Sequence, residues 1–192
     1  MPANVAPRLR TLLALIPAAL LLALVVSCSD ESAPRSAVWI ESIHGGQALE
    51  SDVYNNGDDD VPGTEDDFII EDQVAVEIHN QPSDPALSID PTGPYGAVVF
   101  DRYKVTFHGT EQLDAVEGAM HLRVPSGSTA TGEITIVPAG YKMEAPLQSL
   151  QVGGELLFTA DIVITGKEED SGDAVRVEGS LPVHCANWAD PK

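Results

Sequence analysis

Most of this 192-residue chain alternates between apolar and polar positions with a period of two. The alternation is clearest over residues 73–80, 97–108 and 173–185, and it predicts strands with one face on a core and the other in water. Further strand-like runs cover residues 37–43, 119–124, 132–137 and 142–147, and residues 155–165 form one of the two longest runs together with 173–185. No long window keeps a helical period, and residues 112–118 allow at most one helical turn.

The alternation also assigns faces within two of these strands. Over residues 97–108 it predicts a buried row made of Val99, Tyr103, Val105 and Phe107. Over residues 173–185 it turns Cys185 inward and His184 outward. Because the two side chains point to opposite faces, we expect Cys185 to be a small core residue and not a copper ligand.

Seven or eight short strands separated by Gly and Pro turns predict an all-β fold, an antiparallel β-sandwich in one domain spanning residues 37–188. A small barrel is the alternative. The strand rhythm over residues 37–185 resembles immunoglobulin-like or fibronectin-like modules of bacterial surface proteins. The Cys…Trp…Cys spacing of antibody domains is absent, so the resemblance leaves the strand order open.

The first 28 residues follow a different pattern. Arg8 and Arg10 precede a continuous apolar stretch over residues 12–26, and small Ser27 stands before Cys28. The stretch suits a signal peptide and is short for a membrane-spanning helix. The pattern resembles a bacterial lipoprotein signal with its lipobox; an uncleaved anchor helix, or an ordinary signal peptide with an incidental cysteine, is the alternative.

The lipoprotein resemblance implies that residues 1–27 are a removed signal peptide and that Cys28 carries acyl chains such as palmitate. Residues 28–36 would then be a lipidated tether, and the membrane would be a partner through Cys28. Ser29 stands where an Asp would retain the protein at the inner membrane, which favours the outer membrane and leaves the exposed face open. The expected location is the cell envelope.

Charge narrows the possible partners. The chain has a formal net charge of −20, and removing the leader leaves 8 basic against 30 acidic residues. Such a field repels nucleic acid, which we exclude as a partner. With Cys28 lipidated, Cys185 would stand alone, so cohesion must come from core packing.

An acidic loop over residues 52–67 holds seven carboxylates and no basic residue. Calcium takes six to eight oxygen ligands, and alternating Asp and Asn around a glycine turn supplies them. The EF-hand template fits partly, since Pro62 and Ile69 stand at two ligand positions. We predict a calcium loop whose candidate ligands are Asp52, Asn56, Asp58, Asp60, Asp66 and Asp67. A solvated acidic loop without an ion is the alternative.

Other motifs are sparse. Four prolines stiffen residues 81–96, a connection that could carry binding or simply cross between sheets. The five histidines show no metal spacing, and His79, His108 and His184 are expected on outward faces. No nucleophile elbow, phosphate loop or Cys-x-x-Cys is present.

The sequence therefore favours a non-enzymatic module: a lipid-anchored cell-envelope binding or structural domain that engages an envelope protein or polysaccharide. Calcium would stiffen its acidic loop. The surplus of carboxylates keeps one alternative open, an enzyme or accessory protein that acts on envelope or extracellular polysaccharide. A carrier of an ion or small ligand is a third reading, and it would need a concave pocket.

Overall fold

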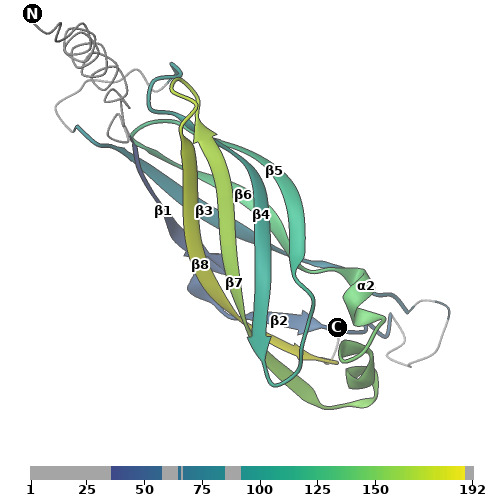
Figure 1. The fold of residues 1–192 in the computed structure, drawn as a ribbon. Coiled ribbons are helices and arrows are strands. Elements are labelled where there is room, and N and C mark those ends of the chain that lie inside the picture. The colour runs from purple at the N-terminus through teal and green to yellow at the C-terminus, as the bar shows by residue number, and fades with distance from the viewer. Residues whose placement is uncertain (1–35, 58–64, 66, 85–91, 189–192) are drawn as a thin grey trace, which may run out of the picture. The chain divides into compact units, whose positions relative to one another are not determined.

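Two β-sheets pack face to face in this protein (Figure 1). The computed structural model describes residues 36–57, 65, 67–84 and 92–188, and all of them belong to one compact unit, Pro34–Lys192. Cys28 and the leader lie outside the described residues. The strands are β1 Ser36–Ile43, β2 Leu49–Asp52, β3 Asp72–Pro82, β4 Val98–Gly109, β5 Val116–Val124, β6 Ser128–Val137, β7 Glu155–Glu168 and β8 Ala174–Ala186.

One sheet has three strands in the order β1-β3-β6, and the other has five in the order β2-β8-β7-β4-β5. Every pairing is antiparallel except β2 with β8, which run parallel. Three short helical segments connect the strands: η1 His44–Gly46, α2 Ala139–Lys142 and η2 Leu147–Val152. The expected all-β sandwich of seven or eight strands is thus confirmed.

The core lies between the inner faces of the two sheets. In β3 Val74, Val76 and Ile78 are buried, while the residues between them face outward. In β7 the same alternation buries Ile162 and Ile164. Burying these β-branched side chains removes apolar surface from water and holds the sheets together.

The two sheets are joined along both long sides of the sandwich, by a turn on one side and by close packing on the other. A turn at residues 125–127 carries β5 of one sheet into β6 of the other. On the opposite side β1 approaches β8 so closely that a Cβ at Gly179 would lie 2.7 Å from Ile43 Cδ1. Glycine at position 179 therefore lets the two sheets meet at this side.

Two local expectations are wrong. The register of β4 shifts between Phe100 and Arg102, which turns Val99 outward and buries Phe100 in its place. The expected strand at residues 142–147 is instead the end of α2 and the turn into η2, where Pro146 cannot donate to a strand ladder. Residues 112–118, for which the sequence allowed at most one helical turn, form none, and residues 116–118 already belong to β5.

The two ends of the sandwich differ, and their names are used below. The Ser36 end holds the start of β1, the end of β3 and the turn at residues 125–127. The Asp72 end holds the end of β2, the start of β3 and α2. Strand β3 joins the two ends and, with 11 residues, is about 33 Å long.

Candidate functional site

A buried lysine fixes both ends of the acidic segment. Lys142 is fully buried, and its Nζ lies 2.9 Å from Asp72 Oδ2. The same amine donates a 2.6 Å hydrogen bond to the backbone oxygen of Asp52. Since Asp52 ends β2 and Asp72 begins β3, one ammonium group holds the two points where residues 53–71 leave and re-enter the sheets.

Ser51 and Cys185 complete this cluster. We call the cluster the loop root, and it consists of Ser51, Asp52, Asp72, Lys142 and Cys185. Ser51 is fully buried and donates a 2.6 Å hydrogen bond to Asp72 Oδ2. That oxygen therefore accepts from both a hydroxyl and an ammonium group, the kind of additional hydrogen bonding that a buried ion pair needs.

The segment leaves the loop root as a short paired stem. Asn55 and Phe68 exchange backbone hydrogen bonds of 3.1 Å in both directions. Tyr54 donates from its hydroxyl to Asp67 Oδ2 at 2.7 Å. Gly57 N donates to Asn55 Oδ1 at 3.0 Å. The acidic loop thus begins from a hairpin-like stem, although its outer residues are not described.

Two of the six candidate calcium ligands have a carboxylate oxygen bound by protein donors. Asp52 Oδ1 accepts from Trp188 N at 3.1 Å and from Tyr54 N at 3.4 Å. Asp67 Oδ2 accepts from Tyr54. Asn56 lies half-buried on the stem. The other three candidates, Asp58, Asp60 and Asp66, lie outside the described residues, so the grouping of the six stays a prediction.

The thiol of Cys185 in the loop root is buried and unreactive. Cys185 is fully buried and stands opposite Ser51 in the parallel pairing of β2 with β8. Burial raises the pKa of Cys185 to about 11, against the opposing effects of a hydrogen bond with Ser51 and of nearby Lys142. Because the thiolate is the nucleophile, this thiol is unreactive at neutral pH. The expectation of a small core residue is confirmed.

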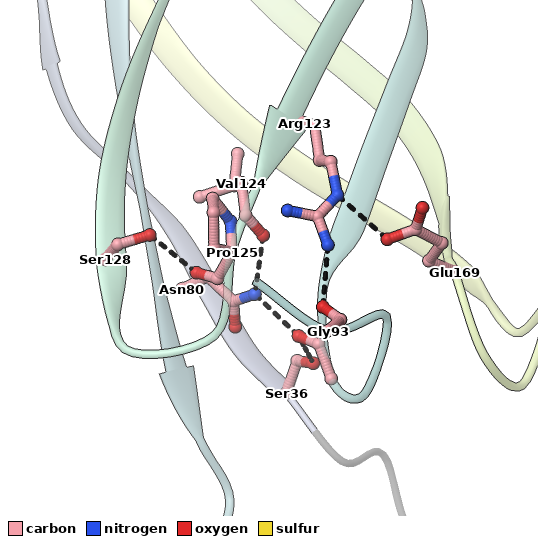
Figure 2. A network of polar contacts seen from close by, with 9 residues as sticks. Ser36, Asn80, Gly93, Arg123, Val124, Pro125, Ser128 and Glu169 are labelled. Carbon is pink, nitrogen blue, oxygen red and sulfur yellow. Dashed lines mark hydrogen bonds and ion pairs between the residues drawn. The ribbon is translucent and has the colours of Figure 1, made fainter. Parts of the chain in front are cut away.

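At the Ser36 end, a second polar network fixes the described part of the proline-rich connection (Figure 2). Buried Asn80 donates from Nδ2 to the backbone oxygens of Gly96 and Val124, at 2.7 and 3.0 Å. Ser36 Oγ donates to the same Gly96 oxygen at 3.0 Å. This part of the connection is therefore packed against β1, β3 and β5, while residues 85–91 are not described.

The histidines lie on outward positions, as expected. His79 stacks on Trp39 with ring centroids 4.6 Å apart, and His108 pairs with Asp161 at 3.1 Å. Within residues 36–57, 65, 67–84 and 92–188, no three His, Cys, Asp or Glu side chains group as a metal site would require. No helix in this described part is both long and apolar enough to cross a membrane.

Sequence reasoning missed Lys142 and Asp72. One signal was available, because Lys142 is the only basic residue between Arg123 and Lys167. A single cation in so long an acidic stretch could have been assigned as the counter-charge that the acidic loop needs. Its assignment to an expected strand concealed that role.

Comparisons with known proteins add little to this geometry. No family model and no curated protein matches the chain. Among solved structures, the chain is similar to the solution structure of a candidate late embryogenesis abundant (LEA) protein. The two share 11% identity with a TM-score of 0.42, over 92% of this chain and 87% of the other. A likeness this distant says nothing about activity.

Proposed function

We propose that this chain is a lipid-anchored binding module of the cell envelope, non-enzymatic, whose acidic loop is stiffened by calcium. The observation that carries the proposal is the loop root. A fully buried lysine with two partners, Asp72 Oδ2 and the Asp52 backbone oxygen, fixes both ends of the acidic segment to the sandwich. Such rigid placement suits a loop that must present its carboxylates in one geometry.

The ends of the sandwich suit display from a membrane. Ser36 opens β1 at one end, and the acidic segment leaves from the other, with the length of β3 between them (Figure 1). A chain anchored through Cys28 would reach the Ser36 end after a short tether. The acidic loop would then lie on the far side of the domain, accessible to an envelope protein or polysaccharide.

Charge supports a cation in the loop. Seven carboxylates lie within residues 52–67, and the described part of the chain supplies one buried ammonium group at their base, shared with Asp72. Carboxylates that are crowded together repel one another, and a calcium ion coordinated by their oxygens would relieve this repulsion.

Calcium binding is tested by calorimetric titration of the full chain in mild detergent, with thermal unfolding measured in calcium and in chelator. We expect micromolar to millimolar binding and a higher Tm in calcium. Both should vanish in Asp58→Ala/Asp60→Ala. The matched control Glu111→Ala/Asp173→Ala removes the same charge from exposed positions outside the loop and should keep both. No heat and no stabilisation in the unaltered chain would refute the calcium part.

Anchoring is tested separately by expressing the full chain with its leader in a bacterium that processes lipoproteins. The expected product fractionates with membranes, begins at Cys28 and carries the mass of acyl chains. Cys28→Ala should abolish the acylated species and keep the leader attached. An unacylated product released without Cys28 at its N-terminus would refute the anchor and leave the calcium test unaffected.

A further inference from the structure

The basic side chains of this acidic protein gather on one surface. Six basic residues are described, and Lys142 is buried in the loop root. The other five lie on the outward face of the five-stranded sheet, in its half next to the Ser36 end. They are Arg102, Lys104, Arg123, Lys167 and Arg176.

The pairing register brings two of the arginines into one row. Arg102 of β4 pairs with Thr165 of β7, and Thr165 pairs with Arg176 of β8. Neighbouring strands lie about 4.8 Å apart, so the two arginines are spaced by about 10 Å with a threonine hydroxyl between them. No carboxylate stands in this row.

A groove of about 520 Å³ lies along this row. Its floor on the outward face includes the small side chains of Ala119 and Thr165 on neighbouring strands. The cations Arg102, Lys104 and Arg176 stand around this floor.

The three cations of the groove differ in how far neighbouring carboxylates occupy their hydrogen-bond donors. Lys104 Nζ binds Glu117 at 2.7 Å, and this hydrogen bond lowers the pKa of the Glu117 carboxyl. Arg176 contacts Glu178 through its Nε alone, which leaves the two terminal NH₂ groups of its guanidinium. The guanidinium group of Arg102 makes no hydrogen bond or ion pair with any other described residue. The groove therefore offers guanidinium donors to an anionic group.

The chemistry of the groove separates classes of partner. Protein interfaces gain most of their energy from buried aromatic, large apolar and arginine anchors, and of these only arginines stand exposed along the groove. Single-stranded nucleic acid needs aromatic platforms, and no exposed aromatic side chain lines the groove. Enclosed small-molecule sites bury most of their ligand, whereas this groove runs over an outward sheet face. An elongated, hydrated polymer that carries carboxylate groups remains.

We propose that this groove binds an acidic polysaccharide, with carboxylates of the sugar chain held by Arg102 and Arg176 and a sugar hydroxyl near Thr165. Guanidinium groups bind carboxylates with paired hydrogen bonds, which gives both affinity and orientation. The inference rests on the proposed function in one respect, because it names the envelope polymer that such a module would engage.

The test measures binding of oligogalacturonate to the full chain in detergent, in chelator so that calcium cannot bridge the two. Oligogalacturonate should bind with an affinity that falls as salt rises, and a neutral maltooligosaccharide of equal length should not. We expect Arg102→Gln/Arg176→Gln to weaken binding at least tenfold with unchanged circular dichroism. Lys167→Gln removes a charge from the same face outside the groove lining and should change affinity less than twofold.

Several results would overturn the assignment. Absence of oligogalacturonate binding would do so, as would equal losses in the groove variant and in Lys167→Gln. Equal binding of polyglutamate with the same dependence on Arg102 and Arg176 would reassign the groove to acidic peptides. Because acylation and calcium are read by separate assays, failure here is distinguishable from failure of the proposed function.

Discussion

Replacing Lys142 with Met tests whether the loop root holds the acidic segment in place. Methionine keeps the apolar length of the side chain and removes its charge, so the change isolates the ammonium group. The wild-type amine is fully buried and has two partners, Asp72 Oδ2 at 2.9 Å and the Asp52 backbone oxygen at 2.6 Å. In Lys142→Met the Asp72 carboxylate keeps the Ser51 hydroxyl as its donor but loses its counter-charge.

The expected loss is large because Asp72 stays largely buried, with a side-chain exposure of 14%. Removing one partner of a buried ion pair costs about 3–5 kcal/mol, most of it from the charge left behind. Exposed pairs contribute much less, about 0–1 kcal/mol. The control Lys104→Met breaks an exposed pair with Glu117. The Lys104 side chain is 51% exposed and the Glu117 side chain is 68% exposed.

Urea unfolding of each variant, followed by far-ultraviolet circular dichroism in chelator, measures the free energy of unfolding. Lys142→Met should lose about 3–5 kcal/mol, and adding Asp72→Asn should restore at least about half of that loss by removing the stranded charge. A loss below about 1 kcal/mol would refute the reasoning. A double variant as unstable as the single one would show that packing, and not charge, dominates the site.

Three further predictions concern other parts of the fold. The pKa of Cys185 is raised from 9.0 to about 11, so between these pH values the thiol ionises in the unfolded chain but not in the folded one. The free energy of unfolding should therefore fall as pH rises through this range, by up to about 3 kcal/mol. Cys185→Ala should remove this dependence of stability on pH. Gly166→Ala places a Cβ 2.2 Å from Val99 O and should cost about 3 kcal/mol or more, whereas Gly140→Ala meets nothing within 4 Å and should leave Tm unchanged or raised. Asn80→Ala loses two buried hydrogen bonds and should speed amide exchange at the Ser36 end, at a cost of about 1–3 kcal/mol.

Alternation predicted the strands because each sheet has one buried and one outward face. It located all of the strands except β2, which has four residues and pairs in parallel with the far longer β8. It failed in β4 at the register shift between Phe100 and Arg102. A bulge inserts one residue into the backbone and reverses the face of every residue on one side, and the side-chain pattern alone does not mark it.

The candidate site was less predictable because its contacts are long-range. The acidic loop stood out as a cluster of like charges along the chain, but Lys142 reaches Asp52 across 90 positions of sequence. Whether a lysine is buried depends on what the fold brings near its amine, and no local pattern records that. The basic groove was hidden for the same reason, since Arg102 and Arg176 share a row only through β7.

The acidic loop and the groove with its arginines should respond differently to the salt concentration of the solution. At the Asp72 end, one buried cation of the described residues holds both ends of a segment whose sequence carries seven carboxylates at residues 52–67, so we expect an ion or water to relieve most of their repulsion. At the Ser36 end, guanidinium groups stand on an outward sheet face without full engagement by protein carboxylates. Salt screens both features, but in opposite senses: it relieves repulsion in the loop and weakens attraction in the groove. A chain that salt stabilises against unfolding, while salt weakens its hold on a polyuronate, would behave as this separation of charge requires.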